Sequence, residues 1–449
     1  MEPFSGNKAR EPNEGKLLTA RTSFMKFGQL LSVQQLIRGG KELPHLSLPL
    51  RIQVRAIIAI FTLLGVFFAS WVSRLPIIKQ ELSVTTGQMG ILLFCLAAGT
   101  VAGLTVARRI QSSLGTQRGL AWTILVASVL LVLLGAATTY GLFPLVCLLL
   151  ILYGAALSST DVLMNVEGAR IERELKRTFL PLLHAFYSFG NVIGAALGWF
   201  VGTERISIFA HYVIIAVLAL AVAGLAVPAL GTPSDTVEPS TAVRSERKKP
   251  KQLFRDPSLL MIALLVMFTA FAEGAGNDWI SLAAFEGHQQ SHSDASLVYA
   301  AFVGAMMIGR LIGGPLVDLL GRTYALAGLT VVGMIGIVLF IYATDVPLLF
   351  VGAFLWGLGV SLGFPLGVSA AANHPTDSAQ RVSLVSIFGY AAMLSGPPVL
   401  GILGHDWGLL MALWIPAVSL LIAMIFIPVI SEKRRSREDV TREMLGGST

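Results

Sequence analysis

Twelve apolar runs, each about as long as a helix that crosses a bilayer, constrain the fold of this chain more than any other feature. A transmembrane helix needs about 20 apolar residues to cross roughly 30 Å of hydrocarbon. Backbone polar groups in lipid must bond within their own segment, and the strands of a barrel would alternate apolar and polar residues. We therefore predict an all-α polytopic membrane protein with twelve transmembrane helices. The runs cover residues 53–73, 87–107, 119–138, 142–166, 180–202, 208–229, 258–282, 295–317, 324–343, 347–371, 383–404 and 408–430.

A hydrophilic segment from Gly231 to Asp256, rich in Pro, Ser, Thr, Lys and Arg, separates six of these runs from the other six. A segment of this composition cannot bury enough apolar surface to form a core, so we expect a flexible cytoplasmic linker. The sequence predicts five regions. They are a cytoplasmic N-terminal tail at 1–49, a six-helix bundle at 50–230, the linker at 231–256, a second six-helix bundle at 257–430 and a cytoplasmic tail at 431–449.

Basic residues indicate the orientation of the helices. The chain is 13% charged with a net charge of +7, and its Lys and Arg residues concentrate in the tails and in the loops after even-numbered runs. The opposite loops hold only Arg74, Lys79 and Arg205. The positive-inside rule then places both termini in the cytoplasm. The positive charge is thus explained by topology, and we expect no nucleic-acid partner.

The two halves of the chain show signs of an internal repeat. Trp71 near the end of the first run matches Trp279 in the seventh at an offset of 208 positions. Gly115 in the sequence Leu-Gly-Thr matches Gly321 in Leu-Gly-Arg at an offset of 206. Near-equal offsets at separate places indicate a duplicated six-helix unit, an arrangement common among transporters. We expect two pseudo-symmetric six-helix bundles.

The segment from Gly314 to Arg322, GPLVDLLGR, resembles the loop signature of the major facilitator superfamily, G-x-x-x-D-x-x-G-R. Gly314, Asp318, Gly321 and Arg322 occupy its defined positions. The first copy, 108–118, is degraded, because Arg108 replaces the first glycine and Ser112 replaces the acidic residue. The resemblance implies the major facilitator fold, in which this loop takes part in gating.

The resemblance extends over about residues 52–430 and points to a bacterial branch often labelled fucose-permease-like, grouped with the inner-membrane protein YbjJ. It implies a secondary transporter with alternating access. Drug/proton antiporters of the superfamily carry an Arg inside the fourth helix, whereas the fourth run here has none before Arg170. A drug or metabolite efflux antiporter is less favoured but stays open as an alternative. The segments that carry the branch resemblance are STDVLMNVEG at 159–168, HAFYSFGNVIGAALG at 184–198, AEGAGNDWISL at 272–282, YAAFVGAMMIGRLIGG at 299–314 and GYAAMLSGPPVLG at 389–401.

Ionisable residues inside the runs are candidates for substrate or proton binding, since each is costly in lipid. At 1.5 Å per residue, Glu273 lies about 21 Å from the inner face, slightly beyond the midplane. It is the first candidate for a proton-carrying or substrate-binding carboxylate. Asn277 and Asp278 lie further out on the same run. Arg310 lies about 9 Å from the inner face, and we therefore expect it to be poorly placed for pairing with Glu273.

Asp161 and His184 are expected to share the inner layer with Arg310. An imidazole titrates near neutral pH, so His184 suits a proton relay, with a packing role as the alternative. Asp161 either binds a ligand or closes the inner end of its helix. We expect Asn165 and Glu167 to contact solvent. The two aromatic residues Trp71 and Trp279 are weaker candidates for stacking on a solute.

The loop signature carries a further expectation. The run that begins near Pro181 follows Thr178, and a free helix N-terminus favours a nearby anion. We expect Thr178 to cap this helix and Asp318 to supply the anion when the cytoplasmic side closes. Ser112 in the first copy cannot do the same, so the matching contact on the other side is expected to be weaker.

The sequence predicts a monomeric transporter that moves a small polar solute, a sugar or another metabolite, across a bacterial cytoplasmic membrane with proton coupling. No nucleotide-binding P-loop is present, so ATP does not drive this chain directly. The seven histidines are scattered and Cys95 and Cys147 lie in apolar runs, so no catalytic residues, metal ligands or cofactors are assigned. An uncoupled channel or sensor and a membrane-embedded enzyme are the remaining alternatives.

Overall fold

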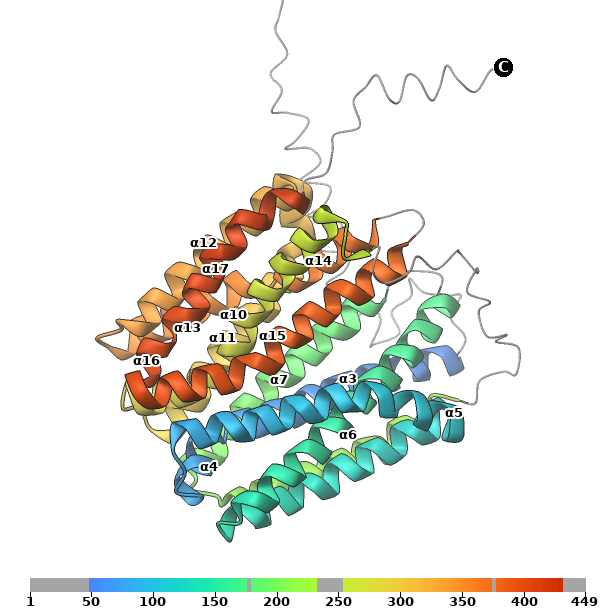
Figure 1. Cartoon of the computed structure of the whole chain (residues 1–449). Coiled ribbons are helices and arrows are strands. Elements are labelled where there is room, and N and C mark those ends of the chain that lie inside the picture. Colours follow the sequence, from blue (N-terminus) through green and yellow to red (C-terminus); the bar gives the residue numbers. More distant parts are fainter. Residues whose placement is uncertain (1–47, 176–178, 232–252, 374–376, 431–449) are drawn as a thin grey trace, which may run out of the picture.

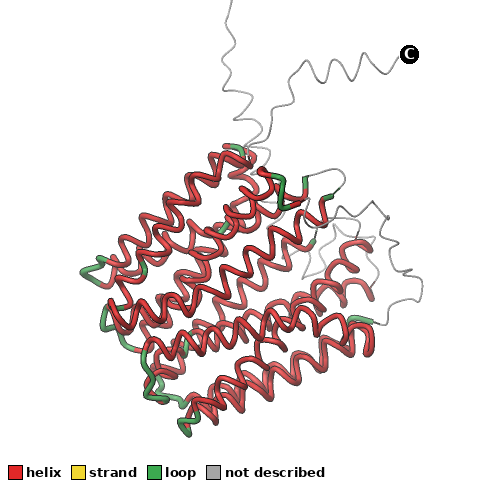
Figure 2. Tube along the Cα trace, viewed as in Figure 1, coloured by secondary structure: helices red, strands yellow, loops and turns green. Residues whose placement is uncertain are grey.

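A computed structural model describes residues 48–175, 179–231, 253–373 and 377–430 of the chain. Within these ranges the regular structure is entirely helical, with short loops between the helices (Figure 2). Most of both predicted tails and most of the linker lie outside the described residues. The helices run back and forth along one direction (Figure 1), as expected for a polytopic membrane protein.

The N-terminal half is built from five long helices and one short one. The short α4 begins with Pro76 in its first turn and follows a break after α3. The elements are α3 (Leu48–Val72), α4 (Leu75–Glu81), α5 (Thr86–Thr139), α6 (Phe143–Leu175), α7 (Leu180–Thr203) and α8 (Ile208–Ala229).

Helix α5 comprises two membrane crossings. Its 54 residues would extend about 80 Å if straight, far more than one bilayer. Gly115 interrupts it with φ 76° and ψ 170°, a left-handed backbone conformation that favours glycine. Eleven helices in the described residues are long and apolar enough to cross a membrane, and α5 counts as one of them. The prediction of twelve crossings is therefore confirmed.

The C-terminal half repeats the pattern with more interruptions. Gly321 ends α11 and precedes α12 with φ 81° and ψ 158°, close to the values of Gly115. The sites matched by the sequence repeat thus adopt the same turn. The elements are α10 (Pro257–Gly287), α11 (His292–Leu320), α12 (Arg322–Ile341), α13 (Val346–Val360), α14 (Gly363–Ala372), α15 (Ser378–Trp407), α16 (Leu409–Ala412), α17 (Trp414–Phe426) and the 3₁₀ helix η1 (Ile427–Ile430).

The outer surface of the helices is apolar, as a lipid-facing surface must be. Leu225 on α8 is 80% exposed and Ile425 on α17 is 72% exposed. In water, such side chains would favour association or aggregation, whereas in a bilayer they contact lipid tails at no cost. These helices are therefore suited to a membrane.

The two halves meet along two helix pairs, α7 with α11 and α5 with α15 (Figure 1). Close approach of α5 and α15 depends on glycine, because a Cβ added to Gly401 would lie 2.7 Å from the Cα of Gly90. Small residues allow backbones to approach in this way in membrane proteins. We call the end of the molecule where α8 ends and α10 begins the linker side, and the opposite end the far side.

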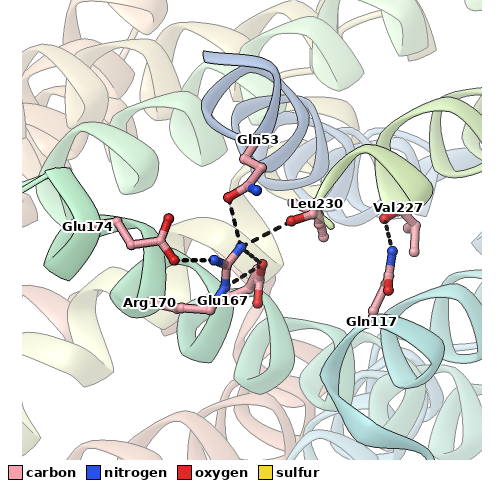
Figure 3. A network of polar contacts seen from close by, with 7 residues as sticks. All are labelled: Gln53, Gln117, Glu167, Arg170, Glu174, Val227 and Leu230. Atoms are coloured by element: carbon pink, nitrogen blue, oxygen red, sulfur yellow. Dashed lines mark hydrogen bonds and ion pairs between the residues drawn. The ribbon is translucent and has the colours of Figure 1, made fainter. Parts of the chain in front are cut away.

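A polar network holds the linker side of the N-terminal half (Figure 3). The guanidinium of Arg170 on α6 donates to Gln53 of α3 at 3.0 Å, to the carbonyl of Leu230 at 3.1 Å and to the carboxylate of Glu167. Glu167 is 5% exposed, so the expectation that it contacts solvent is wrong. Its carboxylate turns inward because Arg170, three residues later, lies on the same helix face.

The C-terminal half has its own linker-side contact. Asp256 caps α10 by accepting hydrogen bonds from the backbone N–H groups of Ser258 and Leu259. Arg381 at the start of α15 donates to the same carboxylate at 2.6 Å. Each half therefore fixes the point where the linker joins it by means of an arginine of its own.

Candidate functional site

An ion pair between α10 and α11 is the centre of the candidate site. Arg310 Nη2 donates to Glu273 Oε1 at 2.7 Å. The Glu273 side chain is 8% exposed and that of Arg310 is 29% exposed. A carboxylate buried to this degree requires a compensating charge, and Arg310 supplies it.

The expectation that Arg310 is poorly placed to pair with Glu273 is wrong for two physical reasons. Helix α11 extends to Leu320, which puts Arg310 about 15 Å from its linker-side end, and Glu273 lies about 24 Å from the start of α10. The two residues therefore differ by about 9 Å in position along the helix axes, and the direction of their side chains makes up this distance. Side chains tilt toward the N-terminus of their own helix, and α10 and α11 run in opposite directions, so these two lean toward each other.

Arg310 also connects the two halves. Its Nη1 donates to Ser188 Oγ on α7 at 3.4 Å. His184, one turn earlier on α7, is exposed and interacts electrostatically with Arg310. The imidazole packs edge-on against Phe61 at a ring distance of 5.6 Å. His184 and Arg310 therefore lie in one region.

Asp161 lies partly exposed on α6 and accepts a hydrogen bond from Asn165 Nδ2 at 3.1 Å. It interacts electrostatically with Tyr187 on α7 and with Tyr390 on α15. Tyr187 interacts electrostatically in turn with Arg310 and Glu273. Asp161 therefore belongs to the same central region as the Glu273–Arg310 pair.

The other candidates on α10 are less directly involved. Asn277 donates to the backbone carbonyl of Glu273 at 3.1 Å, one turn earlier. Asp278 is partly exposed and interacts electrostatically with Tyr299 of α11. The indoles of Trp71 and Trp279 are both 0% exposed, so neither offers a face to a solute in this conformation.

Sequence reasoning missed the roles of Tyr187, Ser188, Asn191 and Tyr390. Ser188 and Asn191 follow His184 at positions +4 and +7, which places them on one face of α7. That spacing was the available signal. Within the described residues, no group of three or more His, Cys, Asp or Glu side chains is arranged to hold a metal ion.

The model of one family matches most of the chain. The model for the Major Facilitator Superfamily matches residues 55–282 and 274–445.

The chain belongs to the major facilitator superfamily. Members of this superfamily are transporters and not enzymes, so the chain is a multi-pass membrane transporter of the MFS type. The family match does not extend to the fucose-permease-like branch.

Three bacterial relatives cover most of this MFS chain. An uncharacterized transporter, y4wD, from Sinorhizobium fredii is 27% identical over 382 residues, covering 84% of this chain and 98% of the relative. An uncharacterized MFS-type transporter from Yersinia pestis is 28% identical and covers 77% and 87%. The membrane protein MosC from Rhizobium meliloti is 28% identical and covers 83% and 89%.

Solved structures share the fold of this MFS transporter. A mutant form of the nucleoside transporter NupG aligns with a TM-score of 0.70 at 14% identity, covering 85% of this chain and 100% of that one. A bacterial homologue of the lysosomal transporter Spinster, solved in an inward-facing and unoccupied conformation, aligns with a TM-score of 0.66 at 15% identity, covering 86% and 97%. At these identities the likeness concerns the fold.

In this conformation the α7 N-terminus of this MFS transporter is occupied by Glu172, which accepts from the N–H groups of Phe179 at 2.6 Å and Leu180 at 2.8 Å. Asp318 of the loop signature is exposed. Its contact with this N-terminus is expected only when the cytoplasmic side closes, so it stays a prediction for that state. Glu172 precedes α7 by only a few residues, so it reaches the free N–H groups locally. Thr178, the expected cap, lies outside the described residues.

Polar contacts also join the halves of this MFS transporter at the far side. Lys79 of α4 pairs with Glu286 at the end of α10. His292 bonds with Gln80 at 2.8 Å, and Ser296 Oγ of α11 donates to the carbonyl of Ser73 at 2.8 Å. The sequence contained the charges of Lys79 and Glu286 but no signal that they meet.

Proposed function

We propose that this transporter moves a small polar solute, such as a sugar or another metabolite, by alternating access, with proton coupling through Glu273. The observation that carries the proposal is the position of Arg310, which bonds to Glu273 within one half and to Ser188 in the other. Protonation of Glu273 would remove the charge that holds Arg310. The guanidinium would then be available to the solute or to groups on α7.

The far-side contacts support the alternating-access part of the proposal. Lys79 and Glu286 close the far side, and the buried apolar core there is continuous across both halves. At the linker side, the buried residues of the C-terminal half, which include Leu259 and Ile430, form a separate cluster. This arrangement fits a state that is closed at the far side and accessible from the linker side.

The distribution of Lys and Arg supports an orientation in the membrane. It favours a cytoplasmic linker side with both termini in the cytoplasm of a bacterial cell. The far side then faces outward, and the described conformation is inward-facing. The proposed solute class is small and polar, and nucleosides, for which the transporter NupG is named, fall within it.

The test is transport by the purified monomer in proteoliposomes. A thermal-shift screen against sugars, organic acids and amino acids selects solutes, and uptake is then measured with and without an inward proton gradient. We expect gradient-driven accumulation and accelerated exchange when unlabelled solute is placed on the other side. Uptake without accelerated exchange would indicate a channel and contradict the proposal.

A further inference from the structure

The carboxylate of Asp161 lies in the central region between the halves without a cationic side chain to match it. Its polar partner within the described residues is the amide of Asn165. Arg310, the nearby guanidinium, is already paired with Glu273 at 2.7 Å. The site therefore contains two carboxylates and one permanent cation among Asp161, Glu273 and Arg310.

An unmatched carboxylate in a site of low dielectric constant is unfavourable unless it is paired or neutralised. Asp161 is partly exposed, so one side of it is open to a ligand. A solute with a positive group could pair with it directly. A solute with a carboxylate or phosphate group would instead be repelled by Asp161.

Two aromatic side chains favour the same kind of ligand. Tyr187 and Tyr390 come from different halves, on α7 and α15, and both interact with Asp161. The faces of aromatic rings attract ammonium groups, and the attraction strengthens when the cation is desolvated. A carboxylate that interacts electrostatically with two tyrosines therefore suits an amine.

We propose that Asp161 binds a protonated amino group of the transported solute, which makes small polar amines the substrate class of this transporter. The inference rests on the proposed function, since it assigns one group of the solute carried through the central site. It adds a contact in the N-terminal half to the Glu273–Arg310 pair of the C-terminal half. Binding of the amine at Asp161 and Tyr390 would draw the two halves together around the solute.

The experiment compares pairs of solutes that differ only in an amine and a hydroxyl group. Glucosamine is measured against glucose, and ethanolamine against ethylene glycol, by thermal shift and by counterflow in proteoliposomes. We expect the wild type to bind at least one amine about tenfold more tightly than its alcohol, the scale of one charge pair. Asp161→Asn keeps the shape of the side chain and should abolish the preference for the amine over its alcohol, because the amine loses its anionic partner.

A matched variant controls for the loss of charge alone. Asp406 is exposed near the far end of α15, so Asp406→Asn removes a carboxylate away from the site and should keep the amine preference. Asp161→Glu retains the charge but moves it, so this variant should still prefer the amine over its alcohol, by a smaller factor than the wild type. Each preference is the ratio of the amine affinity to the alcohol affinity of one variant. A moderate loss of stability in that variant affects both affinities and therefore does not change the ratio.

Two results would overturn the amine assignment. The first is equal binding of amines and alcohols by the wild type, and the second is an amine preference that survives Asp161→Asn. If that variant also loses proton-driven accumulation, Asp161 is a proton site. Wherever the wild type still shows accumulation that depends on Glu273, the proposed transport function would stand. Loss of accelerated exchange for every solute would contradict the proposed function itself.

Discussion

Arg310 donates to Glu273 at 2.7 Å and, through its other terminal nitrogen, to Ser188 of the opposite half at 3.4 Å. One side chain thus contacts both the buried carboxylate and the interface between the bundles. Any change in the charge of Glu273 alters the forces on a group that bridges the two halves. In the proposed function this relationship would connect protonation of Glu273 to movement of the bundles, and the first two predictions test it.

Glu273→Gln should abolish proton-driven accumulation and leave exchange of solute across the membrane intact. The amide cannot release or take up a proton, although it can still accept a hydrogen bond from Arg310. Accumulation under a proton gradient and counterflow without one are measured on the same proteoliposomes. Glu204→Gln, at the exposed end of α7, is the control and should behave as wild type. Normal accumulation by Glu273→Gln, with unchanged pH dependence, would remove Glu273 from coupling.

Arg310→Ala should reduce both stability and transport more than Arg310→Lys does. Truncation leaves the carboxylate of Glu273 buried without a partner, a change that costs about 3–5 kcal/mol. Lysine retains the charge but not the fork that reaches both Glu273 and Ser188. The melting temperature and the initial uptake rate are measured for each variant. The double variant Arg310→Ala with Glu273→Gln should recover part of the lost stability, because no unpaired charge remains. No recovery would mean that the pair does not account for the loss.

Glu286→Gln should shift the population toward the state open at the far side. The carboxylate pairs with Lys79 across the halves, and its side chain is 25% exposed. Loss of about 1–2 kcal/mol changes a population ratio by roughly 5–30-fold. Spin labels at Tyr140→Cys and Tyr342→Cys, exposed far-side positions on the two halves, report the separation after Cys95 and Cys147 are replaced by serine.

The control for the Lys79–Glu286 pair is Glu81→Gln on α4, which removes an exposed far-side carboxylate two residues after Lys79. It should leave the distance distribution unchanged. If Glu286→Gln and Glu81→Gln give the same distribution as the wild type, the Lys79–Glu286 pair does not control opening.

The carboxyl of Asp256, which lies outside the membrane-spanning helices, makes the stability of the protein depend on pH. Burial by itself would raise the pKa of this carboxyl, but the hydrogen bond from Arg381 and those from the N–H groups of Leu259 and Ser258 lower the pKa below its ordinary value. A carboxyl whose pKa is lower in the folded protein than in the unfolded chain stabilises the fold at pH values above its unfolded-state pKa of about 3.9. This stabilisation is lost as the pH falls through the folded-state pKa.

Asp256→Asn keeps the helix cap and removes the charge, so it isolates this effect. We expect the variant to melt below the wild type at pH 7, by the equivalent of about 1 kcal/mol since the Asp256 side chain is 32% exposed. The difference in melting temperature between the wild type and the variant should become smaller as pH falls below about 4. Melting temperatures of both proteins between pH 3 and pH 7 provide the test. A difference that is constant over this range would contradict the assignment.

The crossings and the repeat were predictable because they depend on composition and spacing. Residues suited to lipid recur along the chain at lengths that match a bilayer, and Gly115 and Gly321 are glycines because both turns need a positive φ. Glu273 was identifiable for a similar reason, since an acidic residue deep in an apolar run stands out without any knowledge of packing.

The contacts of the site were harder to predict because they depend on how helices face one another. Depth along a helix placed Arg310 well below Glu273, but the pair forms through side chains that lean together from antiparallel helices. Tyr390 interacts electrostatically with Asp161 only because the two halves pack together. Glu172 takes the α7 N-terminus because a short connection brings it there, and no signal in the loop signature shows this.

The arginines that hold the two ends of the linker have a consequence for how the protein can be assembled. Arg170 fixes the carbonyl of Leu230, the residue that follows α8, with help from Gln117, which donates to the carbonyl of Val227 at 2.8 Å (Figure 3). Arg381 fixes the first turn of α10 through Asp256. Each bundle therefore positions its own chain end without help from the other. Two polypeptides, one ending at Gly231 and one beginning at Leu253, should pair in the membrane as separate gene products and form the same interface along α7 and α11.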